Sequence, residues 1–428
     1  MAATPRRTAS SSRLNPFGDD SMRTTPDHHP GYFAHQLTNP FAAYALGFSF
    51  ALAVYSLGYS DLYPPLQPSL VFFLLATCLV CVLLAVSVGG PVDSVAHRRV
   101  SLELHSYIFL VLMAVFAAEI VYNGGIPLLL IATGADFNYQ EFGIPEVHVA
   151  FVGFCNFYAV YWFDVFILER RRIFIFLSLT AASTSLLIFS RGSFLITLTA
   201  IVFVYVQRRG IGFRLLQSFA VLLVAALWGF GLLGDLRTHG ASGESIILNI
   251  GEASDSFVNS SIPTEIFWPY LYISSPLANL QLNMTDRVAA DSPATYFEVE
   301  FLPDFISKRV VSEAAMSSSA PLLINDQLAV ATMYGRSFLL LGWLGLLLTF
   351  CYFVVVSMFF LRVLRSSKYF VAACSILSSL AFFNVFDSMY LFVGGILQVL
   401  VALFLHLFER RESPPASPIS GDGSTRFS

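Results

Sequence analysis

Apolar runs long enough to cross a membrane alternate with shorter connections over most of this 428-residue chain. About 20 residues of α-helix cross a hydrocarbon core of roughly 30 Å. The runs that fit this length lie at 41–59, 68–89, 104–123, 148–168, 173–189, 193–207, 213–233, 337–361, 369–386 and 389–408. The sequence therefore predicts an all-α fold, a polytopic transmembrane helical bundle with about ten spans.

Charge along the connections tests this count. Every second connection is basic, and the positive-inside rule assigns basic connections to the cytoplasm. The basic connections lie at 97–99, 170–172, 208–209, 362–368 and 410–411. Together with the two tails and Arg214, at the start of the next expected span, they hold 18 of the 24 Lys and Arg residues, and the other six are Arg191, Arg237, Arg287, Lys308, Arg309 and Arg336. The alternation predicts an even number of spans and places both termini in the cytoplasm.

Composition excludes several classes of protein. Only 12% of the residues are charged and 56% are apolar, whereas a soluble domain carries about 25% charged residues. The net charge of -4 gives no basis for nucleic-acid binding. The five cysteines lie inside apolar runs and are interpreted as small buried side chains. Residues 1–39 and 411–428 are polar and are predicted to be disordered cytoplasmic tails, which leaves 40–410 as the membrane domain.

The longest connection, 234–336, falls between the seventh and eighth expected spans, on the outer, periplasmic side. Long connections of this kind are usually functional. We expect it to contain short helices that lie on the membrane. Its segment FWPYLYI, at 267–273, is typical of the aromatic belt at a membrane interface.

Few charged residues fall inside the expected spans. Glu119, Asp164 and Glu169 lie near span ends and Asp387 at an outer turn. We interpret each as a water-accessible carboxylate at the interface. A transporter normally carries buried charge along its ion or substrate path, and the sequence contains no pair of related halves with broken helices.

Three arginines of the outer connections are predicted to lie at one depth. Arg191 occupies the tip of the hairpin between two spans, Arg237 directly follows the span at 213–233, and Arg336 begins the span at 337–361. A planar guanidinium suits phosphate oxygens, so this set predicts a site for a lipid diphosphate. Arg287, in the long loop, is a further candidate. Alternatively, arginines at span ends anchor helices at the interface.

Candidate catalytic residues lie in the long loop. His239 is next to the expected phosphate site and is able to act as general base for a sugar hydroxyl. Glu298 and Glu300 alternate in YFEVEF, which predicts that both face one side of a strand-like segment. The aromatic residues expected either to stack on sugars or to anchor the loop at the interface are Trp268, Tyr270 and Tyr272. The loop has no metal-binding motif, so no metal is expected.

Several short motifs occur in order between residues 40 and 410. They are GGIPL at 124–128, FGIPEVH at 142–148, SRGS at 190–193, YLYISSPLANL at 270–280, ATMYG at 331–335 and GWLG at 342–345. Asn384 and Asp387 follow near the last outer turn. In order and spacing, this set resembles the bacterial oligosaccharide repeat-unit polymerases, the O-antigen polymerase (Wzy-type) family.

The resemblance implies a glycosyltransferase of the bacterial inner (cytoplasmic) membrane that needs neither metal nor cofactor. Such an enzyme joins undecaprenyl-diphosphate-linked oligosaccharide repeat units into O-antigen, capsule or exopolysaccharide on the periplasmic face. The family's periplasmic arginines hold phosphate or anionic glycan, a role that carries over to Arg191, with Arg237 and Arg336 as further matches. The implied partners are the lipid-linked oligosaccharide, the bilayer, a chain-length regulator and a flippase.

Two other functions remain open. An O-antigen ligase has a similar layout, but a His just before the span that follows the long loop would favour it. The only His of this loop is His239, at its start. A flippase or exporter of lipid-linked oligosaccharide would carry a charged central cavity, which the scarcity of charge within the spans argues against.

Overall fold

The computed structural model of the chain describes residues 36–88, 102–133, 141–212, 246–287, 292–302 and 320–412, with a few isolated residues between these ranges. Nearly all of both expected tails and of the expected span 213–233 lies outside the described residues. Arg237 and His239 also lie outside them.

Each expected span within the described residues corresponds to a helix. The helices are α2 (Pro40–Tyr55), α3 (Pro68–Ser87), α4 (Leu102–Asn123), α6 (Val147–Glu169), α7 (Arg172–Leu187), α8 (Arg191–Arg209), α16 (Gly335–Leu364), α17 (Phe370–Phe383) and α18 (Val393–Glu412). Shorter pieces are α5 (Pro127–Ala132), α10 (Ile246–Ile250), α11 (Asp255–Val258) and α13 (Pro293–Glu300). The described part of the chain contains no strand, so the all-α prediction is confirmed there.

In the described part of the chain, four helices are long and apolar enough to cross a membrane. They are Pro68–Ser87, His105–Asn123, Val147–Glu169 and Gly335–Leu364. Large apolar side chains stand exposed on three of these helices, including Phe72 (76%), Val121 (82%) and Val355 (65%). Such wide apolar faces are unstable in water and suit a hydrocarbon environment. Cys351 is exposed on α16, so the expectation that all five cysteines are buried is wrong for this one.

Polar contacts join the helix ends that carry the basic connections, and we call this end of the bundle the basic end. Arg208, at the end of α8, donates two hydrogen bonds to Asp164, near the end of α6, over 2.6 and 2.9 Å. Asp164 is therefore buried and paired, not water-accessible as predicted. The Asn39 side chain, at the start of α2, donates to the carbonyl of Ala85, near the end of α3.

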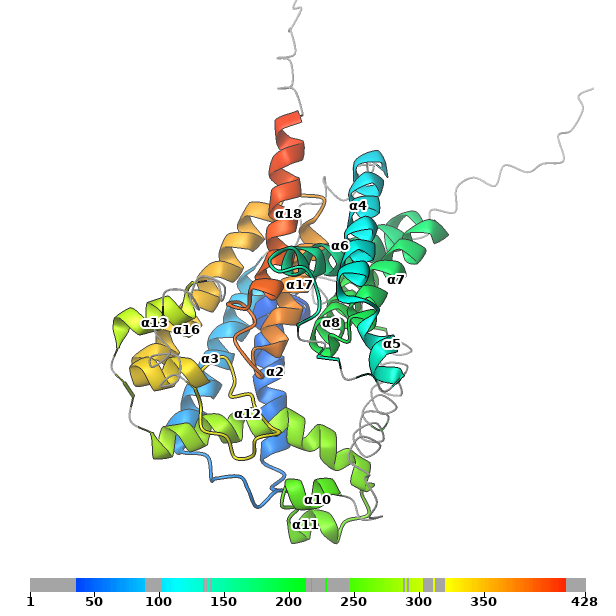
Figure 1. The fold of residues 1–428 in the computed structure, drawn as a ribbon. Coiled ribbons are helices and arrows are strands. Elements are labelled where there is room, and N and C mark those ends of the chain that lie inside the picture. Colours follow the sequence, from blue (N-terminus) through cyan, green and yellow to red (C-terminus); the bar gives the residue numbers. More distant parts are fainter. Residues whose placement is uncertain are drawn as a thin grey trace, which may run out of the picture.

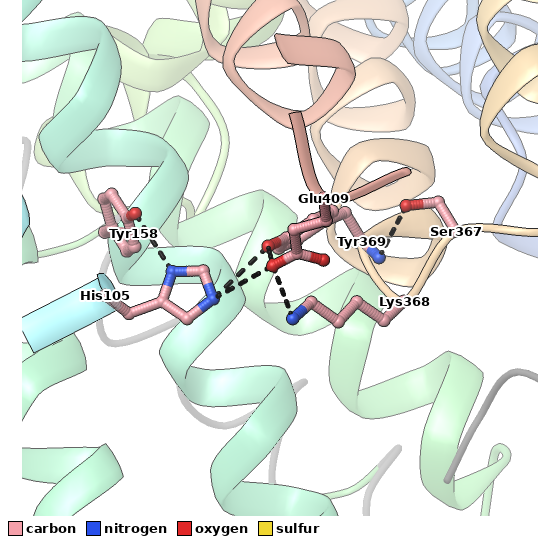
Figure 2. Close-up of polar contacts among 6 residues, drawn as sticks. All are labelled: His105, Tyr158, Ser367, Lys368, Tyr369 and Glu409. Atoms are coloured by element: carbon pink, nitrogen blue, oxygen red, sulfur yellow. Dashed lines mark hydrogen bonds and ion pairs between the residues drawn. The ribbon is translucent and has the colours of Figure 1, made fainter. Parts of the chain in front are cut away.

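A second cluster at the basic end ties together α4, α6, α18 and the residues before α17 (Figure 2). Glu409 of α18 accepts a hydrogen bond from Tyr369 at 2.7 Å and pairs with Lys368 at 2.7 Å. His105 of α4 is fully buried between the hydroxyls of Tyr158 and Tyr369, each 3.2 Å away. The cluster fixes the far end of α18 to the bundle.

At the opposite end, which we call the pocket end, α12 (Phe267–Asp286) lies across the bundle (Figure 1). Its side chains hold the returning chain in place. Asn279 bonds the backbone of Ile324, Leu328 and Val330, and Asn283 bonds both backbone groups of Leu322. The long loop therefore contains helices as predicted, and α12 is packed on α2 and α16 rather than loosely attached.

A sharp kink in α16 creates the docking place for α13. Gly342 has φ 55° and ψ -139°, which interrupts the helix after its first two turns. The carbonyls of Leu339 and Leu340 lose their helical partners there and accept hydrogen bonds from the amides of Ala290 and Ser292 instead. Buried backbone groups need such partners, so the kink and the chain leading into α13 require each other.

Candidate functional site

A pocket of about 170 Å³ opens at the pocket end, where three separate segments of the chain meet. These segments are the end of α13, the turn before α16 together with the first turn of α16, and the residues between α17 and α18. Three charged residues line it: Glu300, Arg336 and Asp387. The structure thus brings together two residues predicted as functional, Glu300 and Arg336, with an acid noted at the last outer turn.

Backbone hydrogen bonds fix the floor of this pocket. The amide of Thr332 donates to the carbonyl of Phe386, and that of Met333 donates to the carbonyl of Asn384. Thr332 has a φ of 60°, which is rare for a β-branched residue. Strained backbone of this kind costs about 1–3 kcal/mol and is concentrated at functional sites. The two hydrogen bonds hold Thr332 in this conformation and bring the 384–388 turn next to Arg336.

Helix α13 carries Glu300 to the pocket wall. The hydroxyl of Tyr296 lies 2.9 Å from Thr349 Oγ1, which also contacts Ser337 Oγ at 2.7 Å. Burial raises the pKa of Tyr296 to about 12, so the hydroxyl stays protonated and able to donate. This interaction anchors α13 to both parts of the kinked α16.

The strand-like interpretation of YFEVEF is wrong, because the segment forms the last turns of α13. Two residues apart on a helix point in nearly opposite directions. Accordingly Glu300 is buried, with 3% exposure, whereas Glu298 is half-exposed and does not line the pocket.

The charges of the site differ in accessibility. Arg336 is exposed and has no ion-pair or hydrogen-bond partner among the described residues, so its guanidinium is available to a ligand. Asp387 is half-exposed, and its Oδ1 accepts the amide of Ser388 at 2.7 Å. One cation beside two carboxylates can bind an anionic group on one side and sugar hydroxyls on the other. The described residues contain no group of three metal-ligand side chains.

The other predicted arginines lie apart from the pocket lining. Arg191 is the first residue of α8, exposed, and its guanidinium lies 5.1 Å from the ring centre of Phe189. Arg287 ends α12 and is half-exposed.

The aromatic residues of the long loop lie in and around its own small core. Trp268 and Tyr270 are buried, with 6% and 4% exposure, and Tyr59 donates its amide to the Tyr270 hydroxyl. Tyr272 is half-exposed and packs near Trp268, with ring centres 6.3 Å apart. Trp268 and Tyr270 therefore pack in the core of the loop rather than standing open as stacking platforms, and anchoring at a membrane interface stays a prediction.

Sequence reasoning missed two features of the pocket end. Thr332 belongs to the motif ATMYG, but nothing in that motif predicts a positive φ. Glu119 was interpreted as water-accessible, yet it is fully buried and paired with His148. A carboxylate within an apolar run together with a His at the start of the next span was the available signal.

The described part of the chain is thus all-helical, with several helices able to cross a membrane and a charged pocket at one end of the bundle. Comparisons of the chain with protein-family models, with curated proteins and with solved structures give no match.

Proposed function

We propose that the chain is an integral-membrane glycosyltransferase that polymerises undecaprenyl-diphosphate-linked oligosaccharide repeat units. In this proposal about ten helices span the bacterial inner membrane, the basic end faces the cytoplasm, and the pocket end faces the periplasm. The observation that carries the proposal is the meeting of Arg336, Glu300 and Asp387 in one pocket at the end opposite the basic connections.

Arg336 supplies the anion contact. It lies in the first turn of α16, and Arg191 lies in the first turn of α8. A cation at the positive end of a helix dipole is destabilised by up to about 1 kcal/mol unless an anion lies nearby. A diphosphate held there removes this repulsion. It also leaves more readily from the sugar when its developing charge is neutralised, by the same electrostatic logic as an oxyanion hole.

The carboxylates supply the sugar contacts. Glu300 and Asp387 are hydrogen-bond acceptors that suit sugar hydroxyls. The pocket, at about 170 Å³, is smaller than the roughly 300–1,000 Å³ sites of drug-sized ligands. It therefore holds one or two sugar rings next to the diphosphate, and the rest of the glycan extends outside.

The test compares variants in a strain that lacks the chain, with the glycans separated on a gel. Wild-type protein and Glu298→Gln, the matched control on the same helix outside the pocket, should restore a polymer ladder. Arg336→Ala should leave single repeat units on their anchor, and Glu300→Gln and Asp387→Asn should shorten or weaken the ladder. Immunoblots of membrane fractions check that each variant is inserted at the wild-type level.

Three results would overturn the proposal. One is a full-length, full-yield ladder from inserted Arg336→Ala protein. Another is polymer that accumulates on undecaprenyl without reaching its anchor in the deletion strain, which indicates a ligase. The third is repeat units trapped on the cytoplasmic face, which indicates a flippase.

A further inference from the structure

A buried carboxylate and a partly exposed imidazole form a pair where α4 and α6 meet at the pocket end. His148 Nδ1 lies 3.0 Å from Glu119 Oε2, and the amide of Ile144 points at Glu119 Oε1 over 3.4 Å. The Glu119 side chain is fully buried, whereas that of His148 keeps 25% of its exposure. A carboxylate only accepts hydrogen bonds, so Nδ1 carries the proton and Nε2 carries the lone pair.

The surrounding chain is shaped to hold the imidazole in this orientation. Gly143 has a φ of 109°, and a Cβ there would lie 2.4 Å from the His148 ring. Only glycine leaves room for the ring at this position. The rings of Phe142 and Phe151 lie 5.6 and 6.4 Å from the imidazole, centre to centre. Glu119 is the charged side chain that pairs with it.

The other imidazole nitrogen is open. Within the described part of the chain His148 Nε2 has no protein partner, so its lone pair can take a proton from a bound molecule. A buried carboxylate behind the opposite nitrogen fixes the tautomer and stabilises the imidazolium that forms, as in hydrolases with a Ser-His-Asp triad. The geometry is that of a general base with its positioning residue.

The pair lies at the same end of the bundle as the pocket. α6 and α18 both run from the pocket end to the basic end, and Gly153 of α6 packs against Leu397 of α18. His148 precedes Gly153 in α6. Phe392, a residue of the pocket wall, precedes Leu397 by the same number of residues. Counted along α6 at a rise of 1.5 Å per residue, His148 lies about 7.5 Å beyond that contact, toward the pocket end. Phe392, directly before α18, is thus the part of the pocket wall from which a bound glycan would reach the imidazole.

We propose that His148 is the general base of the glycosyl transfer and that Glu119 positions it, an assignment that rests on the proposed function. The acceptor hydroxyl gives its proton to His148 Nε2 while its oxygen bonds to the anomeric carbon of the donor glycan. The bond between that carbon and the diphosphate oxygen breaks, and its electron pair leaves with undecaprenyl diphosphate. Glu119 stabilises the imidazolium until the proton passes to water.

The experiment measures polymerisation by purified full-length protein on undecaprenyl-diphosphate-linked repeat units extracted from a strain that lacks the chain. General-base catalysis contributes about 10²–10⁴-fold, so His148→Gln should lower kcat by that factor with little change in KM. Glu119→Gln should lower kcat by a factor of up to about 10⁴, as the corresponding change does to the carboxylate behind the histidine of a Ser-His-Asp triad, and Glu119→Asp should recover part of it. Glu141→Gln, an exposed acid of the same loop, is the matched control and should keep the wild-type rate.

His148→Ala provides a second readout, because it leaves a ring-sized space beside Gly143 that added imidazole can fill. Imidazole should raise the rate of this variant and leave the wild type unchanged. A wild-type kcat in His148→Gln, or an impaired His148→Ala protein that imidazole does not restore, overturns the assignment and leaves the proposed function intact. If the wild-type chain itself joins no repeat units, the proposed function fails, and the assignment fails with it.

Discussion

Replacing Asp164 with Asn removes one charge from the best-paired ion pair of the basic end. Both hydrogen bonds from Arg208 are short, and the two side chains keep only 1% and 15% of their exposure. Breaking a buried pair by removing one partner costs about 3–5 kcal/mol. We expect a loss of about 3 kcal/mol, at the lower end of that range, because Arg208 retains some access to water and the amide oxygen still accepts one hydrogen bond.

Reversible unfolding of the full-length chain in mixed detergent micelles measures this loss. Tryptophan fluorescence is a suitable signal, since Trp162 is fully buried on the same helix. Glu169→Gln is the matched control: it makes the same chemical change on α6, but its partner Arg171 is 3.7 Å away and 64% exposed. Exposed pairs contribute about 0–1 kcal/mol, so this variant should unfold almost as the wild type does.

A double variant separates the unpaired charge from the loss of packing. Asp164→Leu with Arg208→Met removes both charges, and buried ion pairs replaced by apolar residues are often as stable or more so. It should therefore recover most of the stability lost in Asp164→Asn. The reasoning is refuted if Asp164→Asn unfolds within 1 kcal/mol of the Glu169→Gln control, or if the double variant is as unstable as the single one.

Three further predictions use the same unfolding assay. Gly345→Ala should cost about 3 kcal/mol, the upper end for overpacking, because its Cβ would lie 2.0 Å from the carbonyl oxygen of Ser337; a neutral effect would mean that α16 is not folded back on itself. Tyr296→Phe should cost about 1 kcal/mol, the value of one hydrogen bond, because Thr349 keeps its contact with Ser337; a cost above 3 kcal/mol would contradict this. Glu409→Gln should cost about 1.5 kcal/mol, as expected for lost hydrogen bonds to a charged group in the cluster of Figure 2; wild-type stability would show that the cluster does not fix α18.

The positions of the helices could be predicted from the sequence because hydropathy is a local property. The expected spans 68–89 and 148–168 differ from α3 and α6 by at most two residues at either end. The environment of an acid inside a helix is not a local property. Whether Asp164 and Glu119 are buried depends on Arg208 and His148, which lie 44 and 29 residues away in sequence. No pattern within one span reveals such a partner.

The candidate site was predicted in parts. Arg336 and Glu300 were both among the residues predicted from the chain's longest connection, but their meeting with Asp387 in one pocket depends on three segments folding together. The misassigned strand at Glu298 and Glu300 has a simpler cause. The period-2 alternation covered only a few residues, and Pro293, a favoured first residue of helices, was the stronger local signal.

The kink at Gly342 has a consequence for motion. The amides of Ala290 and Ser292 donate hydrogen bonds to two carbonyls of α16. The chain that enters α13 therefore supplies donors that the kinked helix would otherwise lack. If α13 moved away from α16, two carbonyls would lose their hydrogen-bond donors in a region with little water. That loss would cost several kcal/mol. Glu300 and Arg336 should therefore move together as one rigid unit. Hydrogen exchange at the amides of Ala290, Ser292 and the first turns of α16 should occur together.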